Sequence, residues 1–152
     1  MKQIILIALA CTLAMPGFAG RAGYRIVTKE QRAVTQYNMG LQFYYENGPN
    51  QDYTKAAYWY RKAAKHGHPE AQYNLGYFYY YGTGTKQDYN QATYWWRKAA
   101  EQGDAWSQYA LGNCYTKGEG VEQDYTQAVL WFRKAAEQGD AEAQEALREL
   151  GD

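Results

Sequence analysis

The sequence repeats itself at a fixed interval of 36 residues, without gaps, over most of its length. Glycine, aspartate and tryptophan recur in phase in three copies, and each copy carries the same Arg-Lys-Ala-Ala block. The in-phase sets are Gly40, Gly76 and Gly112; Gly48, Gly84 and Gly120; Asp52, Asp88 and Asp124; Trp59, Trp95 and Trp131; and the blocks that begin at Arg61, Arg97 and Arg133. Units of this length bury their apolar faces only against neighbouring units, so the repeat predicts a solenoid.

Each copy predicts a first helix that ends in a glycine-rich turn. In the middle copy, Ala71, Leu75 and Tyr79 recur every four residues and indicate the buried face of this helix. The Gly-Thr-Gly segment at 82–84 predicts the turn that follows. Glycine also falls inside the helix at Gly76, where it costs about 1 kcal/mol relative to alanine. Its recurrence in phase predicts that the second helix approaches closely at this point.

The second helix of the middle copy is predicted to begin after Asp88, whose carboxylate can accept hydrogen bonds from the first turn. Its apolar side is expected to consist of Ala92, Trp95, Trp96, Ala99 and Ala100. Arg97 and Lys98 near the end complement the helix dipole, and Gly103 can adopt the left-handed conformation that ends many helices. Each copy therefore indicates a pair of α-helices.

The middle copy resembles the Sel-one-like repeat, a relative of the tetratricopeptide repeat. The resemblance rests on Ala71, Leu75-Gly76, Tyr79, Gly82, Gly84, Asp88, Ala92, Trp95, Lys98-Ala99-Ala100-Glu101 and Gly103. It implies an all-α, right-handed α/α solenoid with repeats at 33–68, 69–104 and 105–140 and a C-terminal capping helix at 141–152. It also implies a non-catalytic adaptor or scaffold for protein complexes, of a kind that bacteria often export.

The ends of the repeat array carry features that a solenoid needs. In the segment 141–152, Ala143 and Leu147 keep the apolar face, while Arg148 replaces the in-phase glycine. This replacement is expected if no second helix follows to press on that position. At the other end, Thr28 and Gln31 have the spacing of a capping box. The segment 20–32 is therefore expected to hold a short arm and the beginning of the first helix.

Residues 1–19 have the pattern of a signal peptide that is cleaved after Ala19. Lys2 precedes an apolar run over 4–13, which is too short for a bilayer span of about 20 residues. We therefore expect a bacterial protein of the periplasm or the medium, with no integral membrane span in the mature chain. A lipoprotein signal that ends at Cys11 is a second option, although Ala8 occupies the position where leucine is preferred.

Charge and cysteine content exclude some classes of partner and of covalent structure. Lys2 is the one charged residue of the segment 1–19, so the mature chain has 15 basic and 16 acidic side chains. This balance gives no electrostatic reason to expect a nucleic-acid partner. Cys114 has no intrachain partner once Cys11 is removed. Because it is in phase with Phe78, it is expected to pack in the core, with an intermolecular disulfide as the alternative.

A second aromatic stripe lies beside the apolar face of each first helix and supplies the candidate partner-binding residues. They are Tyr37, Tyr44, Tyr45, Tyr73, Tyr77, Tyr80, Tyr81, Trp106 and Tyr109. The resemblance to tetratricopeptide arrays implies that these positions line a concave groove. Four tyrosines of one helix would expose up to about 600 Å², which is near the upper end for monomers. We therefore expect a protein or peptide segment to cover them, although the in-phase Tyr37, Tyr73 and Tyr109 are equally compatible with core packing.

A cell-wall glycan such as peptidoglycan is the alternative partner, because aromatic rings also stack on sugars. Sugar sites place planar hydrogen-bonding groups beside the rings, and Gln72, Asn74 and Asn113 are candidates for this role. A hydrolase is the least expected option. One branch of the resembled family, rich in paired cysteines, includes members that bind or slowly hydrolyse penicillin-like compounds, but the repeats of this chain contain no cysteine pair.

The sequence gives no pattern for a catalytic, metal or cofactor site. Ser107 is in phase with Ala71 and Ala143, which favours a packing residue over a nucleophile. His66 and His68 have no third ligand nearby and are expected on the surface. The in-phase aspartates indicate three helix caps rather than a catalytic pair. The Arg-Lys pairs suggest a basic ridge, but the neighbouring Glu101 and Glu137 favour solvated helix ends.

Overall fold

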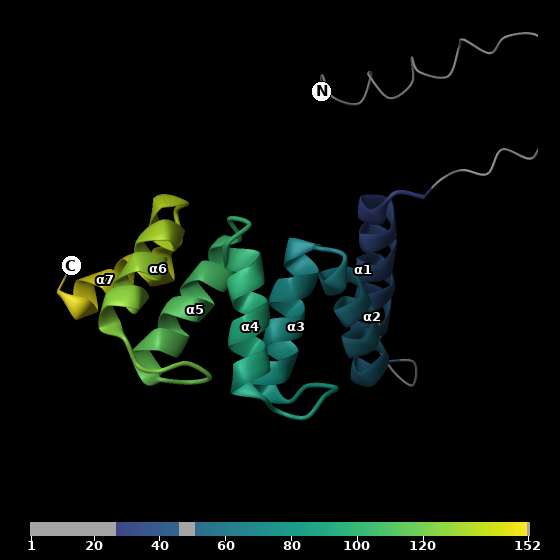
Figure 1. Cartoon of the computed structure of the whole chain (residues 1–152), viewed down its shortest axis with the longest axis horizontal. Helices are drawn as coiled ribbons and strands as arrows, with labels where there is room; N and C mark the ends of the chain where they lie inside the picture. Colours follow the sequence, from purple (N-terminus) through teal and green to yellow (C-terminus); the bar gives the residue numbers. More distant parts are fainter. Residues whose placement is uncertain (1–26, 46–50, 152) are drawn as a thin grey trace, which may run out of the picture.

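The computed structural model describes residues 27–45 and 51–151, and these fold into seven α-helices (Figure 1). The helices are α1 (Lys29–Tyr45), α2 (Tyr53–Lys65), α3 (Pro69–Tyr81), α4 (Tyr89–Ala100), α5 (Ala105–Lys117), α6 (Tyr125–Glu137) and α7 (Ala141–Leu150). The predicted signal peptide, most of the segment 20–32, and Gly48 lie outside the described residues.

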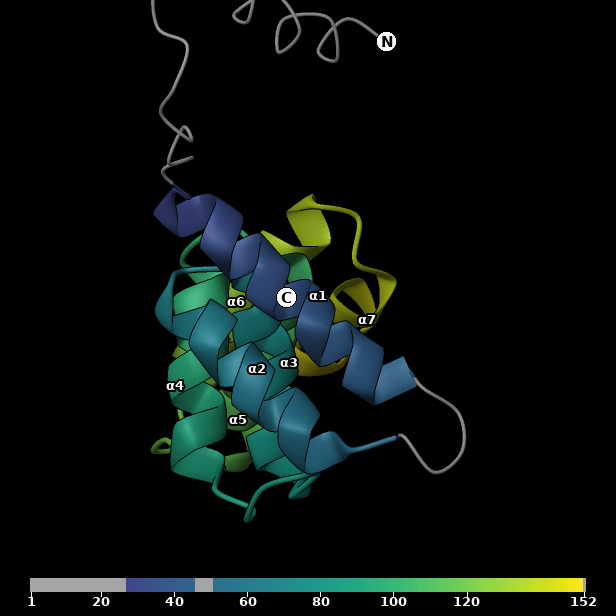
Figure 2. The same cartoon turned by 90° about the vertical axis from the view of Figure 1, so that its right-hand side faces the viewer.

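The helices pack in the order in which they occur along the chain. Each helix packs against the next, so α1 and α2, α3 and α4, and α5 and α6 form three pairs, with α7 at the end. The pairs follow one another along the long axis of the molecule in Figure 1, and Figure 2 shows α1 in front of the stack. The prediction of an all-α array of three helix pairs and a terminal helix is confirmed.

Local signals in the sequence set the beginnings of these helices. Asp88 accepts a hydrogen bond from the Gln91 amide at 3.0 Å, and Asp52 and Asp124 cap α2 and α6 in the same way. The predicted capping box is present at α1, where the Thr28 hydroxyl accepts from the Gln31 amide and the Gln31 side chain accepts from the Thr28 amide, both at 3.1 Å. These bonds satisfy amides that have no partner within the helix.

The glycine inside each first helix makes room for an aromatic ring of the second helix. A Cβ atom added to Gly76 would lie 2.5 Å from two atoms of the Trp96 indole. Gly40 meets the ring of Tyr60 and Gly112 meets the ring of Phe132 at the same separation. The predicted close approach is therefore confirmed, and the group that approaches is a ring at one recurring position.

The core follows the predicted apolar faces with one correction. Ala71 and Leu75 are fully buried, as predicted, together with the aromatic and alanine side chains of α4. Phe78 is 1% exposed, as the core position expected for the in-phase Cys114 implies, whereas the predicted core residue Tyr79 is only partly buried. Neighbouring positions on a helix differ by about 100°, so the four-residue spacing gave the correct face but the wrong member of this pair.

Polar side chains join each repeat to the next. The Gln72 amide donates to the Ala64 carbonyl at 3.1 Å and accepts from the Gln102 amide at 2.7 Å. Gln108 repeats both bonds with Ala100 and Gln138. Gln36 is the residue in phase with Gln72 in the first repeat. Its side-chain oxygen is buried and accepts no hydrogen bond from the described residues. The first repeat has His66 at the position where the other repeats have the donors Gln102 and Gln138.

We expect Gly76→Ala to lower the free energy of unfolding by about 1–3 kcal/mol, because the added methyl group overlaps the Trp96 ring. This loss should exceed the gain in helix propensity, which is about 1 kcal/mol. Urea unfolding followed by circular dichroism measures the change, and Gly112→Ala should behave alike. An increase in stability on either substitution would contradict the packing described above.

Candidate functional site

The nine predicted partner-binding residues line two adjoining hollows between successive first helices. The hollow between α1 and α3, here the α1–α3 hollow, has a volume of about 300 Å³ and includes Tyr37, Tyr44 and Tyr45. The hollow between α3 and α5, here the α3–α5 hollow, has a volume of about 260 Å³. It is lined by the predicted residues Tyr73, Tyr77, Tyr80, Tyr81, Trp106 and Tyr109. Tyr73 and Tyr77 line both hollows, which together form the first-helix groove.

Four of the nine side chains are largely open to solvent. Tyr45 is 68% exposed, Tyr81 60%, Trp106 58% and Tyr77 39%. The other five are only partly buried, so none of the nine is fully enclosed in the core. The wall of the groove therefore combines rings that support the fold with rings that a partner can cover.

Tyr80 is one of the supporting rings. Its hydroxyl donates to a Glu119 carboxylate oxygen at 2.6 Å, and its ring packs against Trp96 with the centroids 5.3 Å apart. Burial, followed by the bond to Glu119, raises the pKa of Tyr80 well above the usual range of tyrosine. The sequence analysis placed Tyr80 with the freely accessible residues, but these contacts link α3 to the loop before α6.

Tyr37 and Tyr44 also have structural contacts. The Tyr37 ring stacks on the His68 imidazole at a centroid distance of 4.4 Å. Tyr44 packs against the buried Phe78 ring at 5.9 Å. Burial raises the pKa of the Tyr37 hydroxyl, and the nearby Glu70 carboxylate raises it further. Both tyrosines therefore line the groove and stabilise the first repeat at the same time.

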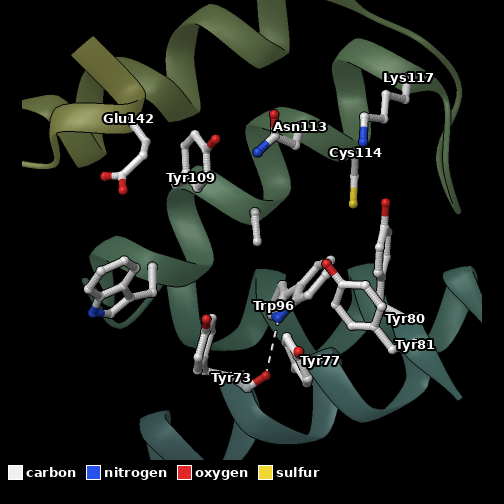
Figure 3. Close-up of a pocket in the computed structure, with 12 residues that line it drawn as sticks. Tyr73, Tyr77, Tyr80, Tyr81, Trp96, Tyr109, Asn113, Cys114, Lys117 and Glu142 are labelled. Carbon is white, nitrogen blue, oxygen red and sulfur yellow. Dashed lines mark hydrogen bonds between the residues drawn. The ribbon is translucent and has the colours of Figure 1, made fainter. Parts of the chain in front are cut away.

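Charged residues at the two ends of the α3–α5 hollow were missed by the sequence analysis. Glu142, from the first turn of α7, lies beside Tyr109, and Lys117 lies at the opposite end of α5 near Cys114 (Figure 3). Neither residue is aromatic, so neither belongs to the aromatic stripe from which the groove was predicted. The contribution of α7 depends on how the capping helix packs, which no local sequence signal reports.

The residues proposed for hydrogen bonding to a sugar are only partly available. Gln72 is 4% exposed and is occupied in the bonds between repeats, so the prediction that it lies beside the groove is wrong. Asn74 lines the α1–α3 hollow. Asn113 faces the α3–α5 hollow (Figure 3). The groove therefore offers a sugar two of the three predicted amide side chains.

The second helices present a different aromatic surface, which the sequence analysis did not predict. Tyr58 is 47% exposed and the in-phase Tyr94 is 49% exposed. Lys62 lies 4.5 Å above the Tyr58 ring, and Lys134 lies 4.2 Å above the Trp131 ring. These lysines are stabilised by cation–π contacts within the chain. Because Tyr58 and Tyr94 are about as exposed as the open rings of the groove, this surface can serve as a control.

The Arg-Lys pairs were predicted to be solvated helix ends, but two of the arginines form hydrogen bonds between repeats and the lysines lie over aromatic rings. The Arg61 guanidinium donates to the Tyr79 hydroxyl at 2.9 Å, and Arg97 donates to Tyr115 at the same distance. These arginines therefore hold neighbouring repeats together.

The serine and histidine side chains that could carry out chemistry are partly or fully buried in the scaffold. Ser107 is fully buried, and its hydroxyl has no hydrogen-bond partner among the described residues. His66 and His68 are partly buried rather than on the surface as predicted, and burial lowers the pKa of His68. The stack on Tyr37 holds the His68 ring in place. Within residues 27–45 and 51–151, no group of three His, Cys, Asp or Glu side chains is arranged to hold a metal ion.

An array of helix pairs with an aromatic groove defines the class of helical-repeat scaffolds, and the comparisons identify the family. The Sel1 repeat model matches residues 33–68, 69–104 and 107–140. The chain belongs to the Sel1 repeat family, whose repeats mediate protein interactions. No curated protein matches it.

Solved structures of Sel1 repeat proteins are similar to this chain. One is a protective antigen present in uropathogenic Escherichia coli strains, with 43% identity, a TM-score of 0.71, and coverage of 73% of this chain and 24% of that protein. A Sel1 repeat protein from Oxalobacter formigenes has 38% identity and a TM-score of 0.72, with 77% and 48% covered. Helicobacter pylori cysteine rich protein B has 25% identity and a TM-score of 0.63, with 82% and 99% covered.

The chain spans about a quarter of the length of the first of these proteins and about half of the second. It therefore shares the repeat unit with both but matches only part of each array. In the part of the chain that the structure describes, no helix combines the length and the apolar character that crossing a bilayer requires.

We expect Ser107→Ala to raise the free energy of unfolding by about 1 kcal/mol, because a buried hydroxyl without a partner is replaced by a methyl group. The in-phase residues Ala71 and Ala143 show that alanine fits this position. Ala71→Ser is the reciprocal control and should lower stability. Urea unfolding measures both changes, and destabilisation by Ser107→Ala would contradict a packing role.

We expect Cys114 to be unreactive in the folded protein. Its side chain is 1% exposed, and burial raises the pKa of the thiol to about 12. The unreactive thiol form therefore predominates at pH 8. Ellman's reagent should react slowly with the native protein and rapidly in urea. Rapid reaction of the native protein would revive the alternative of an intermolecular disulfide.

Proposed function

We propose that the protein is an exported, non-catalytic adaptor that binds a peptide or an extended protein segment along the first-helix groove. Family membership supports a binding scaffold. The observation that carries the finer proposal is the pair of adjoining hollows, which share Tyr73 and Tyr77. An extended segment can therefore run from one hollow to the next without leaving the aromatic surface.

The character of the groove supports a peptide ligand. Tyr77, Tyr81 and Trp106 present rings with large exposed fractions, and such rings bury area at a small cost in conformational entropy. Tyrosine and tryptophan are also the residues that most often dominate the binding energy of an interface. Two observations support a non-catalytic protein. The in-phase aspartates act as helix caps, and the Ser107 side chain is buried in the core.

Export is part of the proposal and rests on the sequence pattern of residues 1–19. These residues lie outside the described part of the chain. A partner in the periplasm, at the cell surface or in the medium would follow from this location.

A peptide-display selection against the protein tests the binding function. We expect selected peptides to lose at least about 10-fold in affinity for a Tyr77→Ala, Tyr81→Ala variant, because interface tyrosines contribute about 1–2 kcal/mol each. Tyr58→Ala, Tyr94→Ala is the control, since it removes two rings of similar exposure from the second helices. Fluorescence anisotropy measures the affinities.

Equal binding to the wild type and the groove variant would refute the groove as the binding site. Helicity of both variants, measured by circular dichroism, should match the wild type, because neither pair of rings is buried. Sedimentation of the protein with purified peptidoglycan tests the glycan alternative. Co-sedimentation that the groove substitutions abolish would favour that ligand over a peptide.

A further inference from the structure

The rings of the α3–α5 hollow differ from the other aromatic surfaces of the molecule. Lys62 and Lys134 cover rings on the second helices, and Arg61 and Arg97 lie over Tyr79 and Tyr115. Among the described residues, no lysine or arginine lies over a ring of Tyr73, Tyr77, Tyr81, Trp106 or Tyr109. The faces of these five rings, which attract cations, are left without one.

Trp106 is the most unusual of these residues. It is 58% exposed in the first turn of α5, and it stacks with no other ring in the described part of the chain. The in-phase residues Val34, Glu70 and Glu142 are all exposed, so this position faces solvent in every copy. An indole at this position gains little for folding, and it is the side chain that binds cations most strongly through its ring.

Two carboxylates, those of Glu142 and Asp104, lie near the Trp106 end of the α3–α5 hollow. Glu142 lies beside Tyr109 (Figure 3), is exposed, and forms no ion pair with a described residue. Asp104 lies close enough to Tyr73 that its charge helps to raise the pKa of that hydroxyl, after burial as the main cause. One oxygen of Asp104 accepts from the Ser107 amide at 2.7 Å. This end of the hollow is therefore both aromatic and negatively charged.

The opposite end of the hollow carries one charge of each sign, because the Glu119 carboxylate that accepts from Tyr80 lies there together with Lys117. Lys117 is the last residue of α5, eleven residues beyond Trp106, which corresponds to about 17 Å along the helix. It lies near Cys114 and faces the hollow (Figure 3). A cation would therefore favour the Trp106 end, which has the carboxylates of Glu142 and Asp104, over the other end, where the charges of Lys117 and Glu119 offset each other.

Building on the proposed function, we infer that the α3–α5 hollow binds a positively charged side chain, lysine or arginine, of the bound peptide. The side chain packs against Trp106, Tyr73 and Tyr109, which line the hollow together with Glu142. Cation–π attraction and the nearby carboxylates act on the same charge. The partner is thus a peptide with a basic residue.

A pair of small probes tests this inference independently of any selected peptide. N-acetyl-arginine amide and N-acetyl-citrulline amide have nearly the same shape, but only the first is charged. We follow the Trp106 indole N–H signal by NMR during titration and assign it by its loss in Trp106→Phe. We expect citrulline to bind at least about 5-fold more weakly than arginine.

Substitution of the carboxylate tests the second part of the site. Glu142→Gln should weaken binding of the arginine probe about 3-fold and leave the citrulline probe unchanged. Glu122→Gln is the matched control, because Glu122 is exposed and does not line this hollow. Equal binding of the two probes, or equal effects of the two glutamine variants, would overturn the inference.

The outcomes for the two proposals are separable. Selected peptides that depend on Tyr77 and Tyr81 but bind equally well with citrulline in place of arginine would refute the basic-residue site and leave the peptide-binding function standing. If no selected peptide depends on those tyrosines, the proposed function fails. The titration of the two probes still decides whether the hollow recognises a positive charge.

Discussion

The fold depends on one contact that occurs in each repeat, in which an aromatic ring of the second helix lies directly on a glycine of the first helix. Tyr60, Trp96 and Phe132 occupy this place on Gly40, Gly76 and Gly112. The ring chemistry varies while the glycine does not, so the constraint is on space rather than on a specific interaction. Dense packing of this kind fixes the separation of the paired helices.

This contact also explains how the first helices can serve the core and the groove together. One side of α3 receives the Trp96 ring at Gly76, and the adjoining side carries Tyr73, Tyr77 and Tyr81 into the two hollows. The Trp96 indole itself lines the α3–α5 hollow and donates a hydrogen bond to the Tyr73 carbonyl at 3.1 Å. The wall of the groove is thus built on the same packing that holds each helix pair.

The features that could be predicted from the sequence are those encoded within a few residues or by the repeat itself. The caps at Thr28 and Asp88 and the close approach at Gly76 all follow from local chemistry or from phase, and the structure confirms them. The groove residues were also found by their spacing. Their use by a partner stays a prediction.

Contacts between side chains far apart in the sequence could not be predicted in this way. The bond from Gln72 to the Ala64 carbonyl joins two repeats, the bond from Gln102 closes its own repeat, and together they remove Gln72 from the surface to which it was assigned. Tyr80 reaches Glu119, 39 residues away, and becomes part of the scaffold. Glu142 reaches the hollow only because α7 packs on α6. Such contacts depend on how the helices stack, which spacing alone does not specify.

The unpaired oxygen of Gln36 makes the array unequal along its length. A glutamine pair closes each of the two later repeats, whereas His66 occupies the position of the donating glutamine in the first repeat and leaves the Gln36 oxygen without a partner among the described residues. In an array where each helix packs mainly on its neighbours, cooperativity passes from one unit to the next. The first repeat therefore lacks a side-chain hydrogen bond that the second and third repeats contain, and this lowers the free-energy cost of opening it.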